Sequence, residues 1–215
     1  MHKRETLLET ALAGAGEALR TCFAEPRARR PLPAAEAGDA HGAELDAAAQ
    51  RCSIRLMRVN HAGEVAAQAL YNGQALFARA PETLEHLIAA AEEENDHLAW
   101  CAQRLAELGG SPSRLTPLWF AGSFCIGALA GMAGDRRSLG FISETETQVE
   151  AHLEDHLRRL PDADIRSRRI LERMAAEESQ HGAAATARGA DAVPALGTRL
   201  MHLGGSILRQ VAQVV

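Results

Sequence analysis

Residues 92–100, with the sequence EEENDHLAW, contain Glu94 and His97 at a spacing of three. Side chains three residues apart on an α-helix lie on one face, one turn above each other. The pair therefore presents a carboxylate oxygen and an imidazole nitrogen to the same point. The same spacing returns as Glu178-Ser-Gln-His181. Two such pairs, with one glutamate from each of two further helices, form the ligand set of a dinuclear carboxylate site in a four-helix bundle.

Glu64 and Glu146 supply the two further glutamates. Pro81 and Pro161 each end a helical pattern, so each marks the turn of a helical hairpin. Glu64 lies 17 residues before Pro81, roughly 25 Å along a helix, and the glutamate of the first pair lies 13 residues after it, roughly 20 Å. In the second hairpin, Glu146 lies 15 residues before Pro161 and the second pair's glutamate lies 17 after it. The depths match within about one turn, so the pattern predicts that all six side chains meet.

The charges of these six residues favour a pair of metal ions. Four carboxylates close together in a core repel one another and resist ionisation. Two divalent cations neutralise four glutamates, and two neutral histidines complete the set. A site that is rich in oxygen, with one imidazole for each metal, suits iron or manganese better than zinc.

The composition fits a helical protein in a reducing compartment. Of the 215 residues, 47% are hydrophobic and only 4% are aromatic, and alanine and leucine dominate. The net charge of −5 and the pI near 6.0 argue against a nucleic-acid partner. The N-terminus has no signal-peptide core, so we expect a cytoplasmic protein. The cysteines are scattered and include no Cys-x-x-Cys, so we expect no disulfide framework. They are Cys22, Cys52, Cys101 and Cys125.

The helical pattern divides the chain into two parts. Residues 1–45 are expected to form a short amphipathic helix over 5–20 and a linker rich in proline and alanine over 24–45. Residues 46–215 are expected to form the domain that holds the dinuclear metal site. Its fold class is all-α, a four-helix bundle with an additional apolar crossover helix and a C-terminal amphipathic helix. The predicted helices span about 45–79, 81–108, 115–134, 138–160, 163–188 and 195–214.

Residues 115–134 contain no charged side chain, which favours contact with a membrane. We expect this stretch to form a helix that dips into the membrane interface, because the aromatic side chains of Trp119, Phe120 and Phe124 suit that region. A buried helix and a true membrane span are the alternatives. Gly127 and Gly131 lie four apart and would allow another helix to approach closely.

The chain contains RVNHAGE at 58–64, ENDHL at 94–98, PLW at 117–119, Glu146 with His152 six residues later, and ESQH at 178–181. These motifs resemble the demethoxyubiquinone hydroxylase family of ubiquinone biosynthesis, a ferritin-like di-iron group. The resemblance runs from about residue 58 to the C-terminus and does not cover the first fifty residues. One departure is Leu153, where some relatives carry a tyrosine.

The resemblance implies that the protein is a dioxygen-dependent di-iron mono-oxygenase that hydroxylates the ring of a demethoxy polyprenyl benzoquinol. It implies two iron ions for each chain. Their implied ligands are the residues that the spacing selects: Glu64, Glu94, His97, Glu146, Glu178 and His181. We expect peripheral attachment to the cytoplasmic face of the cell membrane, and the partners would be the quinol, dioxygen and other proteins of quinone biosynthesis. A homo-oligomer is compatible with this sequence.

Several residues near the predicted ligands can be interpreted in two ways. Tyr71, the only tyrosine, lies on the face of Glu64 and is either a hydrogen-bonding neighbour of the metals or a core residue. His61 and His152 are core histidines or neighbours of a ligand. Three glutamates that adjoin the predicted ligands are expected either to be solvated or to be outer residues, which lie next to a ligand without binding metal; they are Glu92, Glu93 and Glu177. Four histidines are expected at the surface: His41, His86, His156 and His202.

Two other classes of function compete with the hydroxylase. An iron-storage protein of the same fold would need a shell-forming oligomer with a soluble exterior, which the uncharged stretch at 115–134 disfavours. A helical interaction module without metal requires the doubled motif to be accidental. Membrane partitioning distinguishes the first alternative, and elemental analysis distinguishes the second. The sequence contains no Gly-x-Gly-x-x-Gly fingerprint for a nicotinamide domain.

Overall fold

The computed structural model describes residues 16–33 and 45–214, and the described chain contains helices and connecting turns but no strand. The all-α prediction is confirmed. Residues 16–23 are helical, while most of the helix expected at 5–20 lies outside the described residues. All helices predicted after residue 45 are present, with ends that differ by four residues at most. They are α2 (Ala47–Ala75), α3 (Pro81–Glu107), α4 (Thr116–Met132), α5 (Asp135–Arg159), α6 (Ile165–Ala187) and α7 (Ala195–Ala212).

The helix starts follow from their capping residues. Oδ1 of Asp46 accepts hydrogen bonds from the backbone N–H groups of Ala48 and Ala49 at 2.9 and 2.8 Å, which satisfies donors that the first turn of α2 leaves free. Pro81 occupies the first turn of α3, where no backbone N–H is needed. Asp164 caps α6 and also accepts a 2.8 Å bond from Arg104, so the end of α3 is tied to the start of α6.

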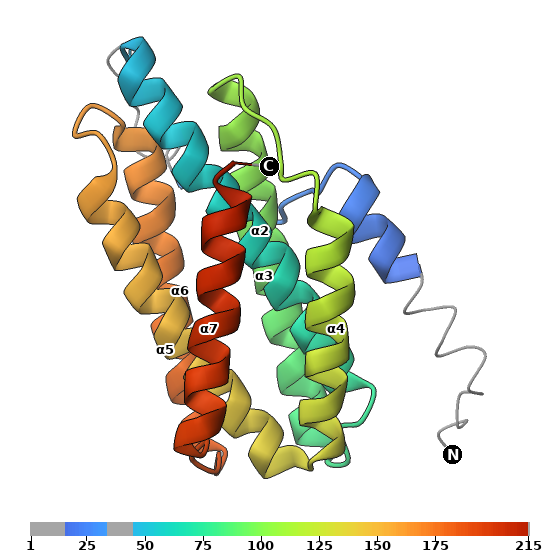
Figure 1. Ribbon diagram of the computed structural model, residues 1–215. Helices are drawn as coiled ribbons and strands as arrows, with labels where there is room; N and C mark the ends of the chain where they lie inside the picture. Colours follow the sequence, from blue (N-terminus) through green and yellow to red (C-terminus); the bar gives the residue numbers. More distant parts are fainter. Residues whose placement is uncertain (1–15, 34–44, 215) are drawn as a thin grey trace.

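Four of the helices form the bundle. α2 and α3 make one antiparallel hairpin, and α5 and α6 make the other (Figure 1). α4 connects the two hairpins and packs along α2, while α7 lies against α2 and α5. One apolar cluster, around Met57 and Ile170, fills one end of the bundle, and a second, around Tyr71 and Leu87, fills the other. The six predicted ligands occupy the polar layer between these clusters.

Glycines bring α4 unusually close to α2. A Cβ on Gly127 would overlap the backbone of Leu70, and a Cβ on Gly73 would overlap the backbone of Phe124. Gly131 likewise lies against the backbone of Gln74. The predicted close approach at Gly127 and Gly131 is therefore confirmed, with α2 as the partner helix.

The orientation of the aromatic residues on α4 differs from the prediction. Phe120 is buried against Val65, and Trp119 and Phe124 are half-buried against the bundle. The exposed apolar side chains of α4 are mainly aliphatic, since a helix that is apolar all round gives no sequence signal for its inner face. The exposed residues are Leu118, Ile126, Leu129 and Met132 on α4, and Leu196, Leu200, Leu203 and Ile207 on α7. Leu208 on α7 is half-buried and packs inward against Val59 and Ala62.

Within the described ranges, every helix is too short or too polar to cross a lipid bilayer. The alternative of a true span at 115–134 is therefore not supported.

Candidate metal centre

The structure brings the six sequence-predicted residues into two overlapping groups. Within each group, one ligand atom per residue lies within 4.8 Å of the others. Glu94 and Glu178 belong to both groups, so they stand between two possible metal positions. The first group is Glu64, Glu94, His97 and Glu178, and the second is Glu94, Glu146, Glu178 and His181.

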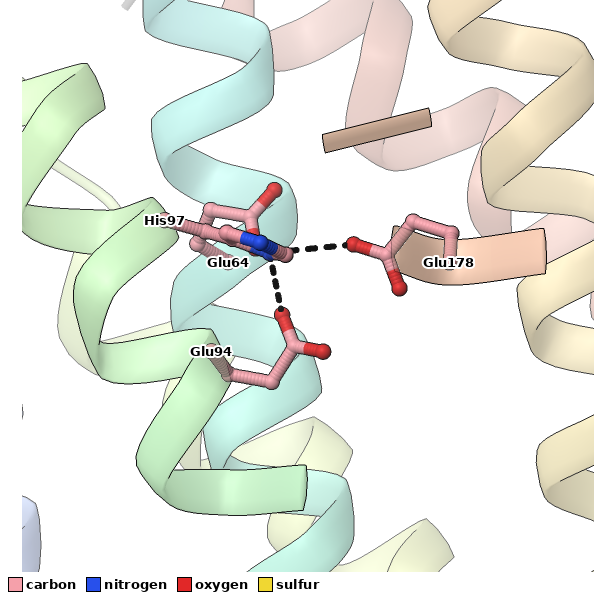
Figure 2. A group of neighbouring side chains, drawn as sticks. All are labelled: Glu64, Glu94, His97 and Glu178. Carbon is pink, nitrogen blue, oxygen red and sulfur yellow. Dashed lines mark hydrogen bonds and ion pairs between the residues drawn. The ribbon is translucent and has the colours of Figure 1, made fainter. Parts of the chain in front are cut away.

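The two histidines point the same nitrogen at the glutamates. Nδ1 of His97 lies 3.3 Å from Glu94 and 3.2 Å from Glu178 (Figure 2). Nδ1 of His181 lies 3.2 Å from Glu94 and 3.4 Å from Glu178. Each histidine is therefore placed by the Glu-x-x-His spacing on its own helix, and it reaches the glutamate of the opposite hairpin as well.

Burial makes this cluster costly without cations. The four glutamates are between 1% and 3% exposed. Oε1 of Glu94, both carboxylate oxygens of Glu178 and Nδ1 of His181 lack a hydrogen-bond partner of suitable geometry. Buried polar atoms without partners are rare, and here they converge on one layer. The donor set fits a carboxylate-rich metal site.

The pKa values show where protons gather in the metal-free cluster. Burial raises the pKa of Glu64 and Glu146 well above the usual range, and the neighbouring glutamates add to the shift. Burial opposes a charge on His181, but its contacts with Glu178 and Glu94 outweigh this and raise its pKa to about 11. The pKa of His97 is raised by Glu94 in the same way. Protons thus supply the positive charge that the clustered carboxylates require.

Each histidine also contacts a carboxylate on its outer side. Nε2 of His97 lies 2.7 Å from Glu177, and Nε2 of His181 lies 3.1 Å from Glu93. A proton on each Nε2 makes these hydrogen bonds and leaves each Nδ1 free to face the cluster. The expectation that Glu93 and Glu177 are outer residues agrees with this geometry.

Tyr71 is a hydrogen-bonding neighbour of the cluster. Its hydroxyl donates to Oε1 of Glu146 at 2.6 Å. Both residues line a small pocket between α2 and α5, together with Ala67, Leu70, Gln74, Phe141, Ile142 and Thr145. This pocket reaches the second group of glutamates.

Other histidines lie outside the cluster. His61 is buried, and its Nδ1 has no partner among the described residues. His202 is exposed and His86 is half-buried, while His41 lies outside the described residues. The prediction of a surface position for His156 is wrong: it is 1% exposed, with Nδ1 2.8 Å from the side-chain oxygen of Asn60 and its ring against that of His152. Its hydrogen-bond partner Asn60 comes from a different helix, α2, which a pattern within α5 cannot reveal.

Two residues near the centre were missed by the sequence analysis. Arg30 bonds to both Asp96 and Glu177, yet it lies in a stretch that reads only as a linker. Asp96 is 3% exposed although it sits between the two members of a Glu-x-x-His pair. A buried aspartate implies a cationic partner, but the sequence does not identify which arginine supplies it.

Comparison with known proteins adds a family and a fold. The family profile described as ubiquinone biosynthesis protein COQ7 matches residues 51–212. The chain is 51% identical over 205 residues to a 3-demethoxyubiquinol 3-hydroxylase of Xanthomonas oryzae pv. oryzae, with 95% of this chain and 93% of the relative covered. It is also 51% identical to proteins of the same description from Janthinobacterium sp. (91% and 92% covered) and Variovorax paradoxus (95% and 97% covered).

A solved structure supports the fold. A dodecameric thioferritin from Bacteroides fragilis aligns with a TM-score of 0.52 over 75% of this chain and 90% of its own, at 16% sequence identity. At that identity the likeness concerns the fold alone, and it confirms the ferritin-like architecture. The assignment of the six residues as metal ligands is not tested by these comparisons and stays a prediction.

Proposed function

The chain belongs to the family of the ubiquinone biosynthesis protein COQ7, and on this premise we propose that it is a 3-demethoxyubiquinol 3-hydroxylase. One observation carries the proposal. In a chain 51% identical to such hydroxylases over almost its whole length, two Glu-x-x-His pairs and two single glutamates from four helices converge on one buried layer.

The proposed cofactor is a pair of iron ions. One ion would be held by Glu64, Glu94, His97 and Glu178, and the other by Glu94, Glu146, Glu178 and His181, so that Glu94 and Glu178 could serve both ions. Carboxylates suit a metal that changes valence, because each can bind through one oxygen or two. When bound, the iron pair supplies the reduction of dioxygen, with one oxygen atom entering the ring and the other leaving as water. The two electrons come from outside the chain, and we propose that they derive from a nicotinamide and arrive through the quinone itself.

The chain's own residues are proposed to position the quinol ring. Tyr71 and Glu146 line the pocket between α2 and α5, so a ring that enters it would lie near the second group of predicted ligands. Most of the lining is apolar, which excludes water from the reacting ring. The small size of the pocket means that side chains such as Phe141 must move to admit the substrate.

The substrate implies a membrane. A polyprenyl tail favours lipid by about 0.8 kcal/mol for each buried methylene, so the enzyme must collect the quinol at a bilayer. We propose peripheral binding to the cytoplasmic face of the cell membrane through the exposed apolar residues of α4 and α7. α4 packs against the backbone of Leu70, a residue that also lines the pocket. Arg137 and Arg199 lie near the two apolar surfaces in the sequence and are suited to anionic head groups.

The test is the quinone composition of cells that lack the protein. We expect a demethoxy quinone to accumulate and ubiquinone to disappear. A plasmid carrying the wild-type chain should restore ubiquinone, while one carrying Glu178→Ala should not, because Glu178 is shared by both metal positions. Normal ubiquinone in the deletion strain, without another hydroxylase that supplies the activity, would refute the proposal.

A further inference from the structure

Residues 27–32 lie before the region matched by the family profile, yet they pack directly outside the metal centre. The backbone carbonyl of Arg27 accepts a hydrogen bond from Asn95, and the backbone N–H of Arg29 donates to Asp96 at 2.6 Å. Leu32 is buried in the apolar cluster that contains Trp100. This segment is therefore anchored on both sides of Arg30.

Arg30 connects three side chains of the bundle. Its Nη1 and Nη2 donate to the two oxygens of Glu177 at 2.6 and 3.1 Å, and its Nε donates to Asp96 at 2.6 Å. The guanidinium also lies over the ring of Trp100, 4.9 Å from the centroid. A bidentate arginine–carboxylate pair fixes the orientation of the carboxylate as well as attracting it, so Arg30 sets the position of Glu177.

Glu177 in turn holds His97. Its Oε2 accepts from Nε2 of His97 at 2.7 Å, and the side chain of His97 is fully buried. Arg173 gives Glu177 a second cationic partner at 2.5 Å. The other oxygen of the carboxylate is thus occupied, and the glutamate cannot turn away from the histidine without breaking both arginine contacts.

The equivalent arrangement on the other side is much looser. Glu93 contacts His181 at 3.1 Å, but its side chain is 47% exposed, and among the described residues it pairs with no arginine. The side chain of His181 is 9% exposed, against 0% for His97. The two halves of the centre therefore share a ligand pattern and differ in what holds the histidines.

We propose that Arg30 is a positioning residue for the metal centre: through Glu177 it fixes His97 and makes the His97 position bind its metal more tightly than the His181 position. The inference rests on the proposed two-metal centre. Outer partners that orient a ligating histidine are typically worth 10- to 100-fold in metal affinity. Residues 27–32 thereby become part of the working enzyme although they precede the family's matched region.

The test measures Co²⁺ binding to the full-length, metal-free protein by competition with a chelator, with the visible Co²⁺ spectrum as a second readout. In the wild-type protein we expect two binding steps of unequal affinity. Arg30→Gln should weaken the tighter step by about 10- to 100-fold and change the weaker step less than about twofold. Arg29→Gln is the matched control, because within residues 16–33 and 45–214 the Arg29 side chain pairs only with the exposed Glu92, and its backbone bond to Asp96 remains. Both steps should be unchanged.

A double variant separates positioning from a general loss of structure. If Arg30 acts through Glu177, Arg30→Gln should add no further weakening in a Glu177→Gln background. Equal weakening of both steps, additive effects in the double variant, or the same loss in Arg29→Gln would overturn the inference. If the Gln variant does not fold, Arg30→Lys decides: weakening confined to the tighter step supports the inference, and any other result overturns it. A wild-type protein that binds no Co²⁺ would instead contradict the proposed metal centre itself.

Discussion

Tyr71 and Glu146 are joined by a hydrogen bond of 2.6 Å between the phenol hydroxyl and Oε1 of the carboxylate, and both side chains line the pocket between α2 and α5. The bond connects α2 to α5 beside the second group of predicted ligands. Tyr71 thus orients a predicted ligand at the place where the quinol ring would arrive.

Tyr71→Phe removes this hydrogen bond and keeps the ring. We expect the iron content to stay near the wild-type value, because all six predicted ligands remain, and turnover of the quinol to fall by roughly tenfold as Glu146 loses its orientation. Steady-state kinetics with parallel iron analysis check this. Unchanged turnover would mean that the bond contributes only to packing.

The overlap of the two groups predicts unequal effects of ligand loss. His181→Ala removes a residue of the second group only, so about one of the two ions should remain. Glu178→Ala removes a residue of both groups and should leave less metal than His181→Ala. Elemental analysis of protein from iron-replete cells measures both. Wild-type protein without iron or manganese would contradict the site, and equal losses in the two variants would contradict the sharing.

Metal affinity should rise with pH. The pKa of His181 is raised to about 11 in the metal-free protein, and the pKa of His97 is raised too. Both imidazoles are therefore protonated at neutral pH, and a cation must displace these protons to bind. We expect the increase in melting temperature on adding metal to grow between pH 6 and pH 8. An increase that is independent of pH would show that no protons are released.

The buried histidine His156 of α5 predicts that the folded protein loses stability in acid. Burial lowers the pKa of His156 to about 2, so this residue stays neutral in the folded protein and takes up a proton on unfolding below pH 6.5. Its folded pKa is depressed, and stability therefore falls as the pH drops through 6.5, by about 1 kcal/mol between pH 6.5 and 5.5. Urea unfolding of wild-type protein and His156→Gln at both pH values tests this. The variant should lose about 1 kcal/mol less than the wild type, since protonation elsewhere is common to both and cancels.

Membrane binding should depend on the exposed aliphatic residues of α4. We expect the triple variant Leu118→Ser, Ile126→Ser, Leu129→Ser to lose flotation with anionic vesicles and activity on long-tailed quinols, and to retain activity on a short-tailed, water-soluble quinol. Ile88→Ser is the control, because Ile88 is 49% exposed on α3. Trp119 and Phe124 are unsuitable targets, since they pack against the bundle. Full flotation of the triple variant would exclude α4 as the contact surface.

The bundle and the convergence of the six residues could be predicted from sequence because both follow from helical periodicity. Glu94 and His97 share a face whatever surrounds them, and Pro81 and Pro161 fix the depth of each hairpin. The same reasoning could not identify the partners of Arg30 or the burial of His156, which depend on contacts between distant helices. It also misplaced the aromatic residues of α4, which carries no polar face to mark its outside. The division of the chain at residue 45 stays a prediction.

The pairing of Arg30 with Glu177 also has a consequence for the order in which the protein forms. The two residues are 147 positions apart, and a chain emerging from the ribosome has made Arg30 long before Glu177 exists. The α2–α3 hairpin, whose contacts are local, can form early. Residues 27–32 cannot complete their contacts beside His97 until α6, which carries Glu177, has been synthesised and has packed against the bundle. Residues 27–32 are thus synthesised before the bundle helices but are among the last to reach their final position.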